Sequence, residues 1–184
     1  MSIPFIDLKP QHEHLLSDLW PEYERIFNAS HFILGEEVEK FERVFAEYLG
    51  VDTAVGVNSG TDALLMALRA LDIGEGDEVI CPVYTFVATA DAIVRSGARP
   101  VFVDIDPRTY NIDPEKIADA VTDKTRAVIV VHLYGQAADM DAVQAIAKDK
   151  KLAVIEDAAQ ALGAKWRDKP VGTIGDVGCF SFYP

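Results

Sequence analysis

The sequence predicts an α/β fold in which a mostly parallel sheet is covered by helices on both faces. From residue 53 onward, short β-branched apolar runs alternate with segments of helical periodicity, and no low-complexity linker interrupts them. Parallel strands need crossover connections, which helices usually supply. The composition agrees, because 49% apolar and 26% charged residues are close to the average of folded domains. The length of 184 residues suits one domain with a sizeable core, or part of a larger protein.

Six short runs are the expected strands of this sheet. Each is rich in β-branched and other apolar residues, and turn residues or helical patterns separate one run from the next. The six runs are Thr53–Asn58, Glu78–Cys81, Pro100–Asp104, Arg126–His132, Leu152–Glu156 and Val177–Phe182.

Two helical segments lie between expected strands and therefore read as crossovers. The apolar residues of Thr61–Asp72 form one helical face, and Asp139–Lys150 repeats this pattern. A third amphipathic helix is expected within Gly35–Gly50. The first thirty residues look like an extended arm followed by a short helix, and such arms often lie on a partner subunit.

Charge and composition exclude several classes of protein. Seventeen Lys and Arg against thirty Asp and Glu give a net charge of −13, which repels nucleic acids and anionic lipids. No segment approaches the roughly 18 apolar residues that a membrane span needs, and the N-terminus lacks the features of a signal peptide. The two cysteines, Cys81 and Cys179, are far apart and in no zinc-binding or redox motif. We therefore expect a cytoplasmic protein with no nucleic-acid, membrane or metal partner.

The first candidate binding site is the turn Asn58–Asp62, which follows the first expected strand and opens a helix. In open parallel sheets, ligands bind at the carboxyl ends of the strands. The first N–H groups of the helix and the hydroxyls of Ser59 and Thr61 could hold a phosphate. Alternatively, Ser59 or Thr61 serves only as the N-cap of the helix.

Two further candidates follow strands of the same sheet. Asp157 comes directly after Leu152–Glu156, where a carboxylate could pair with a protonated ring nitrogen or could cap a following helix. Phe86 follows Glu78–Cys81, where its ring could stack on a planar cofactor or could belong to the core.

Other acidic and histidine residues favour structural roles. Asp104 and Asp106 resemble a metal-binding pair, but they lead into a turn with Pro107, and we expect no metal there. His132 ends a strongly apolar strand and could act as a catalytic base, although a hydrogen-bonded structural histidine is commoner in such a place.

The ordered set of motifs resembles the DegT/DnrJ/EryC1/StrS family of pyridoxal-phosphate-dependent sugar aminotransferases. The resemblance covers essentially the whole chain, and its specificity comes from the number and order of the motifs. They are Phe5–Leu8, Gly35–Glu42, Asn58–Leu64, Cys81–Thr89, Pro100–Asp106, His132–Gln136, Glu156–Gln160 and Gly178–Pro184.

This resemblance implies the aspartate aminotransferase-like (type I) fold, with a large domain built on a mostly parallel seven-stranded sheet. The smaller C-terminal domain of the family is absent from this chain. Residues 1–34 would form an N-terminal arm and helix, and residues 35–184 would form the cofactor-binding large domain, incomplete at its C-terminal end.

The resemblance also implies the cofactor pyridoxal 5′-phosphate and a set of residues that contact it. Asp157 is the one catalytic residue expected within the chain, because it would pair with the pyridine nitrogen. The implied contacts are Gly60, Thr61 and Ser181 with the phosphate, Phe86 stacked on the ring, Asp157 at the ring nitrogen and Gln160 beside the phenolic oxygen.

The lysine that forms the Schiff base in the family is expected two residues beyond Pro184. Lys165 and Lys169 do not replace it, because they lie in a polar, hairpin-like segment and are expected to be solvated. We interpret the chain as the front portion of a longer protein. Either the sequence was divided at a cofactor-linked lysine, which we favour, or the chain is truncated there.

The implied activity is transfer of an amino group from a donor such as glutamate to a keto group of a nucleotide-linked sugar, in a homodimer with shared active sites. The segment His132–Gln136 favours a 3-keto over a 4-keto sugar. Two alternatives stay open: a related sugar dehydratase with histidine in place of the lysine, and a non-catalytic nucleotide-binding α/β module.

Overall fold

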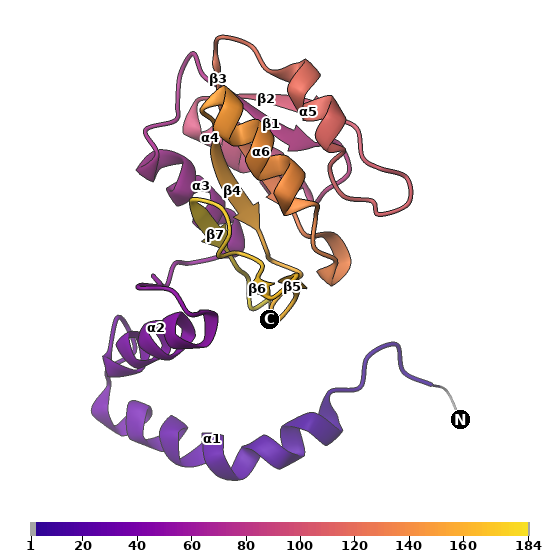
Figure 1. Cartoon of the computed structure of the whole chain (residues 1–184). Helices are drawn as coiled ribbons and strands as arrows, with labels where there is room; N and C mark the ends of the chain where they lie inside the picture. Colours follow the sequence, from indigo (N-terminus) through magenta and orange to yellow (C-terminus); the bar gives the residue numbers. More distant parts are fainter. Residues whose placement is uncertain (1–2, 184) are drawn as a thin grey trace. The chain divides into compact units, whose positions relative to one another are not determined.

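A computed structural model of the chain describes residues 3–183, which fall into two compact units that divide between Gly56 and Val57 (Figure 1). The first unit contains α1, Lys9–Ala29, and α2, Glu36–Leu49. The expectation of a short first helix is wrong, since α1 has 21 residues and continues through Pro21. The predicted division into residues 1–34 and 35–184 concerns the domains of the complete protein and stays a prediction.

The second unit contains a five-stranded sheet in which every pair of neighbouring strands is parallel, in the order β2-β1-β3-β4-β7 (Figure 1). This confirms the predicted parallel α/β fold, with five strands within the described residues against the seven that the resemblance implies for a whole large domain. The strands are β1, Glu78–Pro82; β2, Arg99–Val103; β3, Thr125–Val131; β4, Ala153–Asp157; and β7, Val177–Cys179.

Five of the six predicted strands are present, with ends that differ by at most three residues. The sixth, Thr53–Asn58, is wrong, because this segment pairs with no strand in the described part of the chain. It crosses the boundary between the two units, and its Gly56 N–H donates to the Glu42 carboxylate at 2.6 Å. Val55 is 77% exposed, so the apolar residue that suggested a buried strand is not buried.

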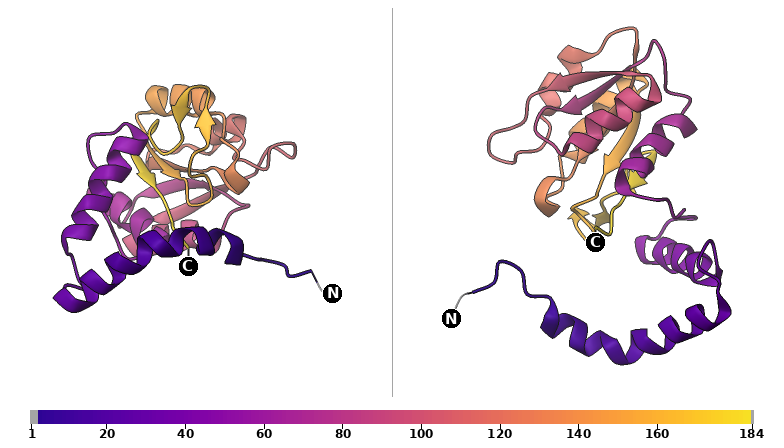
Figure 2. Two further views of the ribbon diagram at one scale, coloured as in Figure 1. Left: turned by 90° about the horizontal axis from the view of Figure 1, so that it is seen from below. Right: turned by 180° about the vertical axis from the view of Figure 1, so that it is seen from behind.

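Helices cover both faces of the sheet (Figures 1 and 2). Strand residues alternate between two apolar clusters, as the period-two geometry of a strand requires. Ile155 packs in the cluster with α3 and α4, whereas Val154 packs in the cluster with α5 and α6. These helices are α3, Gly60–Ala70; α4, Val87–Ser96; α5, Pro114–Ala120; and α6, Met140–Lys150.

The two predicted crossover helices correspond to α3 and α6, and Gly35–Gly50 corresponds to α2 with a glycine at each cap. The sequence analysis missed α4 and α5. The start of α5 carries a recognisable signal, since Asp113 accepts a hydrogen bond from the Glu115 amide and a proline follows it in the first turn.

The remaining short elements are η1, Leu133–Gly135, and the antiparallel pair β5, Lys165–Trp166, and β6, Lys169–Pro170. This pair confirms the hairpin-like segment, and both of its lysines are exposed. Within residues 3–183, no helix is both long and apolar enough to cross a membrane.

The buried carboxylate of Glu156, at the end of β4, joins the sheet to the loop that precedes β7. Its side chain is fully buried and accepts four hydrogen bonds. Three come from the backbone amides of Gly172 at 2.7 Å and of Ile174 and Gly175 at 2.6 Å each. The fourth partner is His132 Nε2 at 2.9 Å. Burial raises the pKa of this carboxyl, but these hydrogen bonds outweigh it and leave the pKa lowered.

His132 is a structural histidine, not a catalytic base. Its Nδ1 accepts the Ala138 N–H at 3.1 Å, so the ring proton resides on Nε2 and is donated to Glu156. The ring is fully buried, and both of its nitrogens are occupied by these two bonds.

We predict that Glu156→Gln destabilises the intact protein by about 2–5 kcal/mol at pH 7, because the amide group of Gln would face backbone N–H donors that need an acceptor. Urea unfolding measures this loss. The matched control is Glu75→Gln, at an exposed position, which should change stability by less than about 0.5 kcal/mol.

The same residue gives a pH dependence whose sign follows from the pKa. Because the folded pKa lies below the ordinary 4.5, Glu156 contributes stability above pH 4.5 that is lost as the pH falls through the folded pKa. The difference between wild type and Glu156→Gln should shrink in that range. Equal stability of the two proteins at pH 7 would contradict this account.

Candidate functional site

The predicted site residues lie at the carboxyl edge of the sheet or at the N-terminus of α3. The ends of β3, β4 and β7 are in register, with Val131 opposite Asp157 and Asp157 opposite Cys179. Loops from neighbouring strands therefore open at one edge. The predicted residues are Gly60 and Thr61 at the start of α3, Phe86 after β1, Asp157 at the end of β4, Gln160 three residues later and Ser181 two residues after β7.

Ser181 packs directly against Gly60. A Cβ atom added at residue 60 would lie 2.9 Å from the Ser181 Cβ and 3.3 Å from its Oγ, closer than side chains tolerate. Only glycine allows the segment after β7 to approach the first turn of α3 this closely. The structure thus brings together two predicted phosphate contacts that are far apart in the sequence.

The N-terminus of α3 presents several donors beside this contact. Ser59 is the N-cap, because its Oγ accepts the Asp62 N–H at 3.1 Å. The amides of Gly60 and Thr61 belong to the first turn and have no carbonyl partner within the helix. With the positive end of the helix dipole and the nearby hydroxyls, these donors fit a phosphate group. Ser59 therefore serves as the N-cap of the helix, whereas the Thr61 hydroxyl remains a candidate phosphate ligand.

Asp157 is 7% exposed and its carboxylate is held from two sides. Its Oδ2 accepts the Thr89 hydroxyl at 3.0 Å, and its Oδ1 accepts the Ala159 N–H at 3.3 Å. Burial raises the pKa of Asp157, while both hydrogen bonds act in the opposite direction. Turns follow Asp157, so the helix-cap alternative is wrong.

The sequence analysis assigned no role to Thr89, although it is fully buried and holds Asp157. Phe86 is the N-cap of α4, so Thr89 lies in the first turn of that helix. The signal that could have found it is the helix N-terminus after β1, which places the motif Thr85–Thr89 at the carboxyl edge. Its partner lies 68 residues away, and nothing in the local pattern identifies it.

Phe86 and Gln160 complete the predicted set. The Phe86 ring is 69% exposed, so its assignment to the core is wrong and its face remains available for stacking. Gln160 Oε1 accepts the Tyr134 N–H at 2.9 Å, which fixes the amide orientation and leaves the Gln160 NH₂ group as a donor. Tyr134 has a left-handed backbone, with φ of 57°, and its hydroxyl lies 3.0 Å from that of Tyr84.

The acidic pair expected to form a turn does so. Asp106 Oδ1 accepts the Arg108 N–H at 2.7 Å and Oδ2 accepts from its guanidinium at 2.8 Å. These bonds lower the pKa of Asp106 to about 2. The Asp104 carboxylate forms an ion pair with Lys116 at 3.4 Å. Among residues 3–183, no group of three or more His, Cys, Asp or Glu could hold a metal ion.

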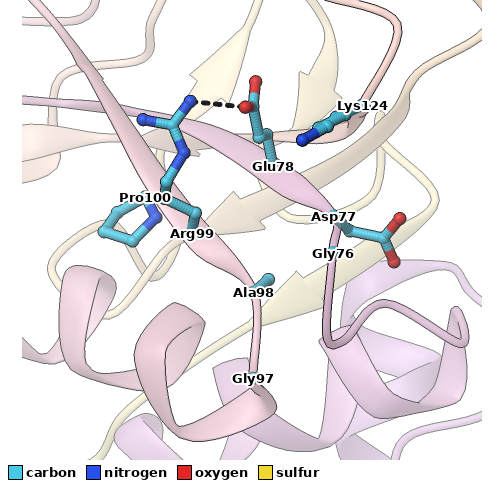
Figure 3. A pocket seen from close by; sticks show the side chains of 8 residues that line it. All are labelled: Gly76, Asp77, Glu78, Gly97, Ala98, Arg99, Pro100 and Lys124. Carbon is cyan, nitrogen blue, oxygen red and sulfur yellow. Dashed lines mark hydrogen bonds and ion pairs between the residues drawn. The ribbon is translucent and has the colours of Figure 1, made fainter.

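A hollow of about 300 Å³ lies at the opposite, amino edge of the sheet, around the starts of β1 and β2 (Figure 3). Glu78 and Arg99 form an ion pair there, and Lys124 lies beside Glu78 (Figure 3). This hollow is separated from the predicted site by the length of the strands.

The family model for the DegT/DnrJ/EryC1/StrS aminotransferases matches residues 17–184. A pleiotropic regulatory protein of Geobacillus stearothermophilus is 50% identical over 184 residues, which are 100% of this chain and 50% of that protein. The UDP-N-acetyl-3-dehydro-α-D-glucosamine 3-aminotransferase of Acidithiobacillus ferrooxidans is 48% identical over 183 residues, covering 100% of this chain and 50% of the enzyme.

Among solved structures, the crystal structure of S. venezuelae DesV in complex with a ketimine intermediate superposes with a TM-score of 0.95 at 46% identity. The match covers 99% of this chain and 49% of DesV. The chain therefore spans about half the length of the relatives that it matches.

We predict that Gly60→Ala destabilises the protein by about 1–3 kcal/mol, because the added methyl group collides with Ser181. In an open helical position the same change would stabilise by about 0.5–1 kcal/mol. The sign of the change in the free energy of unfolding, measured with urea, therefore shows whether residue 60 is in close contact with Ser181. The double variant Gly60→Ala, Ser181→Gly removes the collision and should recover most of the loss; a stabilising Gly60→Ala would disprove the close approach.

Proposed function

The chain belongs to the DegT/DnrJ/EryC1/StrS aminotransferase family, and we propose that the protein is a pyridoxal 5′-phosphate-dependent sugar aminotransferase. It transfers an amino group from an amino acid, glutamate in our proposal, to a keto group of a nucleotide-linked sugar. The donor becomes a 2-oxo acid as the sugar keto oxygen is replaced by an amino group.

The observation that carries this proposal is the placement of two oppositely charged environments at one sheet edge. The contact between Gly60 and Ser181 provides donors for an anion, whereas Asp157 provides a buried carboxylate. Asp157 is in register with Cys179, only two residues before Ser181. A phosphate at one end and a protonated ring nitrogen at the other match this polarity.

Gly60, Thr61 and Ser181 hold the phosphate. The amides in the first turn of α3 donate to phosphate oxygens, and the Thr61 and Ser181 hydroxyls add two donors. No lysine or arginine belongs to this set, so the helix dipole and the directed N–H groups provide the binding.

Asp157 and Phe86 hold the ring. When bound, the cofactor supplies an electron sink for the carbon that carries the amino group. Asp157 Oδ holds a proton on the ring nitrogen, because a nearby carboxylate favours the charged form of that nitrogen. Phe86 covers one face of the ring and excludes water from it, and Gln160 donates its NH₂ group beside the phenolic oxygen.

The substrate in this proposal is a 3-keto sugar. The segment His132–Gln136 favours it, and the Acidithiobacillus relative is named for transfer to a 3-dehydro sugar. A homodimer with shared active sites and the two-domain division at residue 35 are part of the same proposal.

Absorbance and product analysis test the proposal on the intact protein. With added pyridoxal 5′-phosphate, the protein should show a visible absorbance band, and glutamate with a nucleotide-linked 3-keto sugar should yield the amino sugar and 2-oxoglutarate in equal amounts. A protein that stays colourless would instead be a nucleotide-binding module.

We predict that Asp157→Asn lowers the amino-transfer rate by about 10²–10³-fold while pyridoxal 5′-phosphate still binds, because a neutral amide no longer holds the ring nitrogen charged. Steady-state kinetics and a cofactor titration measure the two effects. Near-normal turnover would reduce Asp157 to a structural residue.

The same variant should not lose stability. The folded pKa of Asp157 is raised above its ordinary 3.8, because burial disfavours the ionised carboxylate. Its contribution to the stability of the fold is therefore fully present below pH 3.8 and is lost as the pH rises through the folded pKa, where ionising the buried group costs free energy. Asparagine removes this cost, so thermal unfolding of the cofactor-free variant at pH 7 should occur at the wild-type temperature or higher.

We predict that Thr61→Ala and Ser181→Ala each weaken pyridoxal 5′-phosphate binding by about 1–3 kcal/mol, since each removes one hydroxyl that donates to a phosphate oxygen. Fluorescence titration measures the affinity. Pyridoxal without the phosphate serves as the control ligand, because its binding should change little; equal losses for both ligands would argue against the phosphate assignment.

A further inference from the structure

The hydroxyl groups of Thr85 and Thr89 form a short hydrogen-bonded chain that ends at the Asp157 carboxylate. The Thr89 hydroxyl lies 3.0 Å from Asp157 Oδ2, and the Thr85 hydroxyl lies 2.9 Å from that of Thr89. Thr89 is fully buried at the point where α4 begins, on the face of the sheet that Asp157 shares with α3 and α4.

The direction of this chain depends on the charge of Asp157. A hydroxyl has one hydrogen and can accept two more bonds. When Asp157 is ionised, Thr89 donates to it and must accept from Thr85. When Asp157 is protonated, it can donate to Thr89, and the chain can reverse. An ionised Asp157 therefore sets one order along the two bonds, from Thr85 to Thr89 and from Thr89 to Asp157.

We propose that Thr89, supported by Thr85, is a positioning residue that fixes the rotation of the Asp157 carboxylate and keeps it ionised. This inference rests on the proposed cofactor site. Of the roughly four lone-pair positions of a carboxylate, Thr89 and the Ala159 amide occupy two. The others remain for the protonated ring nitrogen.

Packing alone does not explain a threonine at this position. Valine has the same shape, and a fully buried site favours it, because a buried hydroxyl costs free energy unless it is hydrogen-bonded. The hydroxyl is therefore accounted for by its bond to Asp157. That bond opposes the effect of burial on the pKa of Asp157.

The other titratable groups around Asp157 do not replace Thr89. His132 and Glu156 are paired with each other and hold a single buried proton between them. Cys179 in β7 stays neutral, because burial raises its pKa to about 12. On α4, the carboxylate of Asp91 pairs with Arg95 at 3.7 Å, and Arg95 also reaches Asp62 on α3 at 3.9 Å.

The test compares three variants of the intact protein loaded with pyridoxal 5′-phosphate labelled with ¹⁵N in the ring. Thr89→Val keeps the shape and removes the hydroxyl, and Thr89→Ser keeps the hydroxyl. Thr122→Val is the matched control, since the Thr122 hydroxyl also donates to a carboxylate, that of Glu78 at 2.7 Å, at the opposite sheet edge.

In Thr89→Val, the ring-nitrogen NMR signal should move toward the deprotonated position, and affinity for pyridoxal 5′-phosphate should fall about 10-fold, the size of one hydrogen bond to a charged group. The acid limb of the affinity profile should shift to higher pH, because the pKa of Asp157 rises without this donor. Thr89→Ser should restore the signal and the affinity, and Thr122→Val should match wild type.

An unchanged ring-nitrogen signal in Thr89→Val, with lower stability only, would overturn the inference and make Thr89 a structural residue. If Thr89→Val does not fold, Thr85→Val decides, since it should shift the signal in the same direction by a smaller amount, and no shift would overturn the inference. A wild-type protein that binds no pyridoxal 5′-phosphate would overturn the proposed function and, with it, this inference. A wild-type protein that binds the cofactor, with an unchanged signal in Thr89→Val, would overturn the inference alone.

Discussion

The placement of the candidate site depends on the burial of one charge, the carboxylate of Glu156. A carboxylate without access to water is tolerated only when donors surround it, and here His132 and three backbone amides do so. Those amides belong to the loop between β6 and β7, so the path of that loop is fixed by the charge that it surrounds. The strand that follows leads to Ser181 and its contact with Gly60.

Successive residues at the end of β4 serve opposite faces of the sheet. Glu156 continues the face of Val154, with α5 and α6, and Asp157 continues the face of Ile155, with α3 and α4. One acid is saturated with hydrogen bonds and has a lowered pKa, whereas its neighbour has two bonds, a raised pKa and a small exposed fraction. This difference in environment, rather than residue type, separates the structural acid from the candidate catalytic one.

The parallel sheet could be predicted from the sequence because its central strands, β1, β3 and β4, are almost wholly buried and therefore appear in the sequence as apolar runs. Thr53–Asn58 has the same composition without a partner strand, which composition cannot reveal. The sequence analysis missed α4 because three of its four buried residues, Ala88, Thr89 and Ala92, are small and give little hydrophobic contrast, which leaves Ile93 as the one large buried residue. The motifs identified every candidate site residue except Thr89, whose role depends on a contact between α4 and β4 that no local pattern contains.

The contact between Gly60 and Ser181 has a consequence for the order of events during protein synthesis. The two residues lie near opposite ends of the sequence of the second unit, so they meet only after the intervening strands and crossovers have been synthesised. Contacts of such long sequence separation form late and slowly in folding. A ribosome-bound chain that has exposed only α3 and the first strands therefore has the helix terminus without its opposing hydroxyl, and capture of a small anion at this place must await the emergence of the segment after β7.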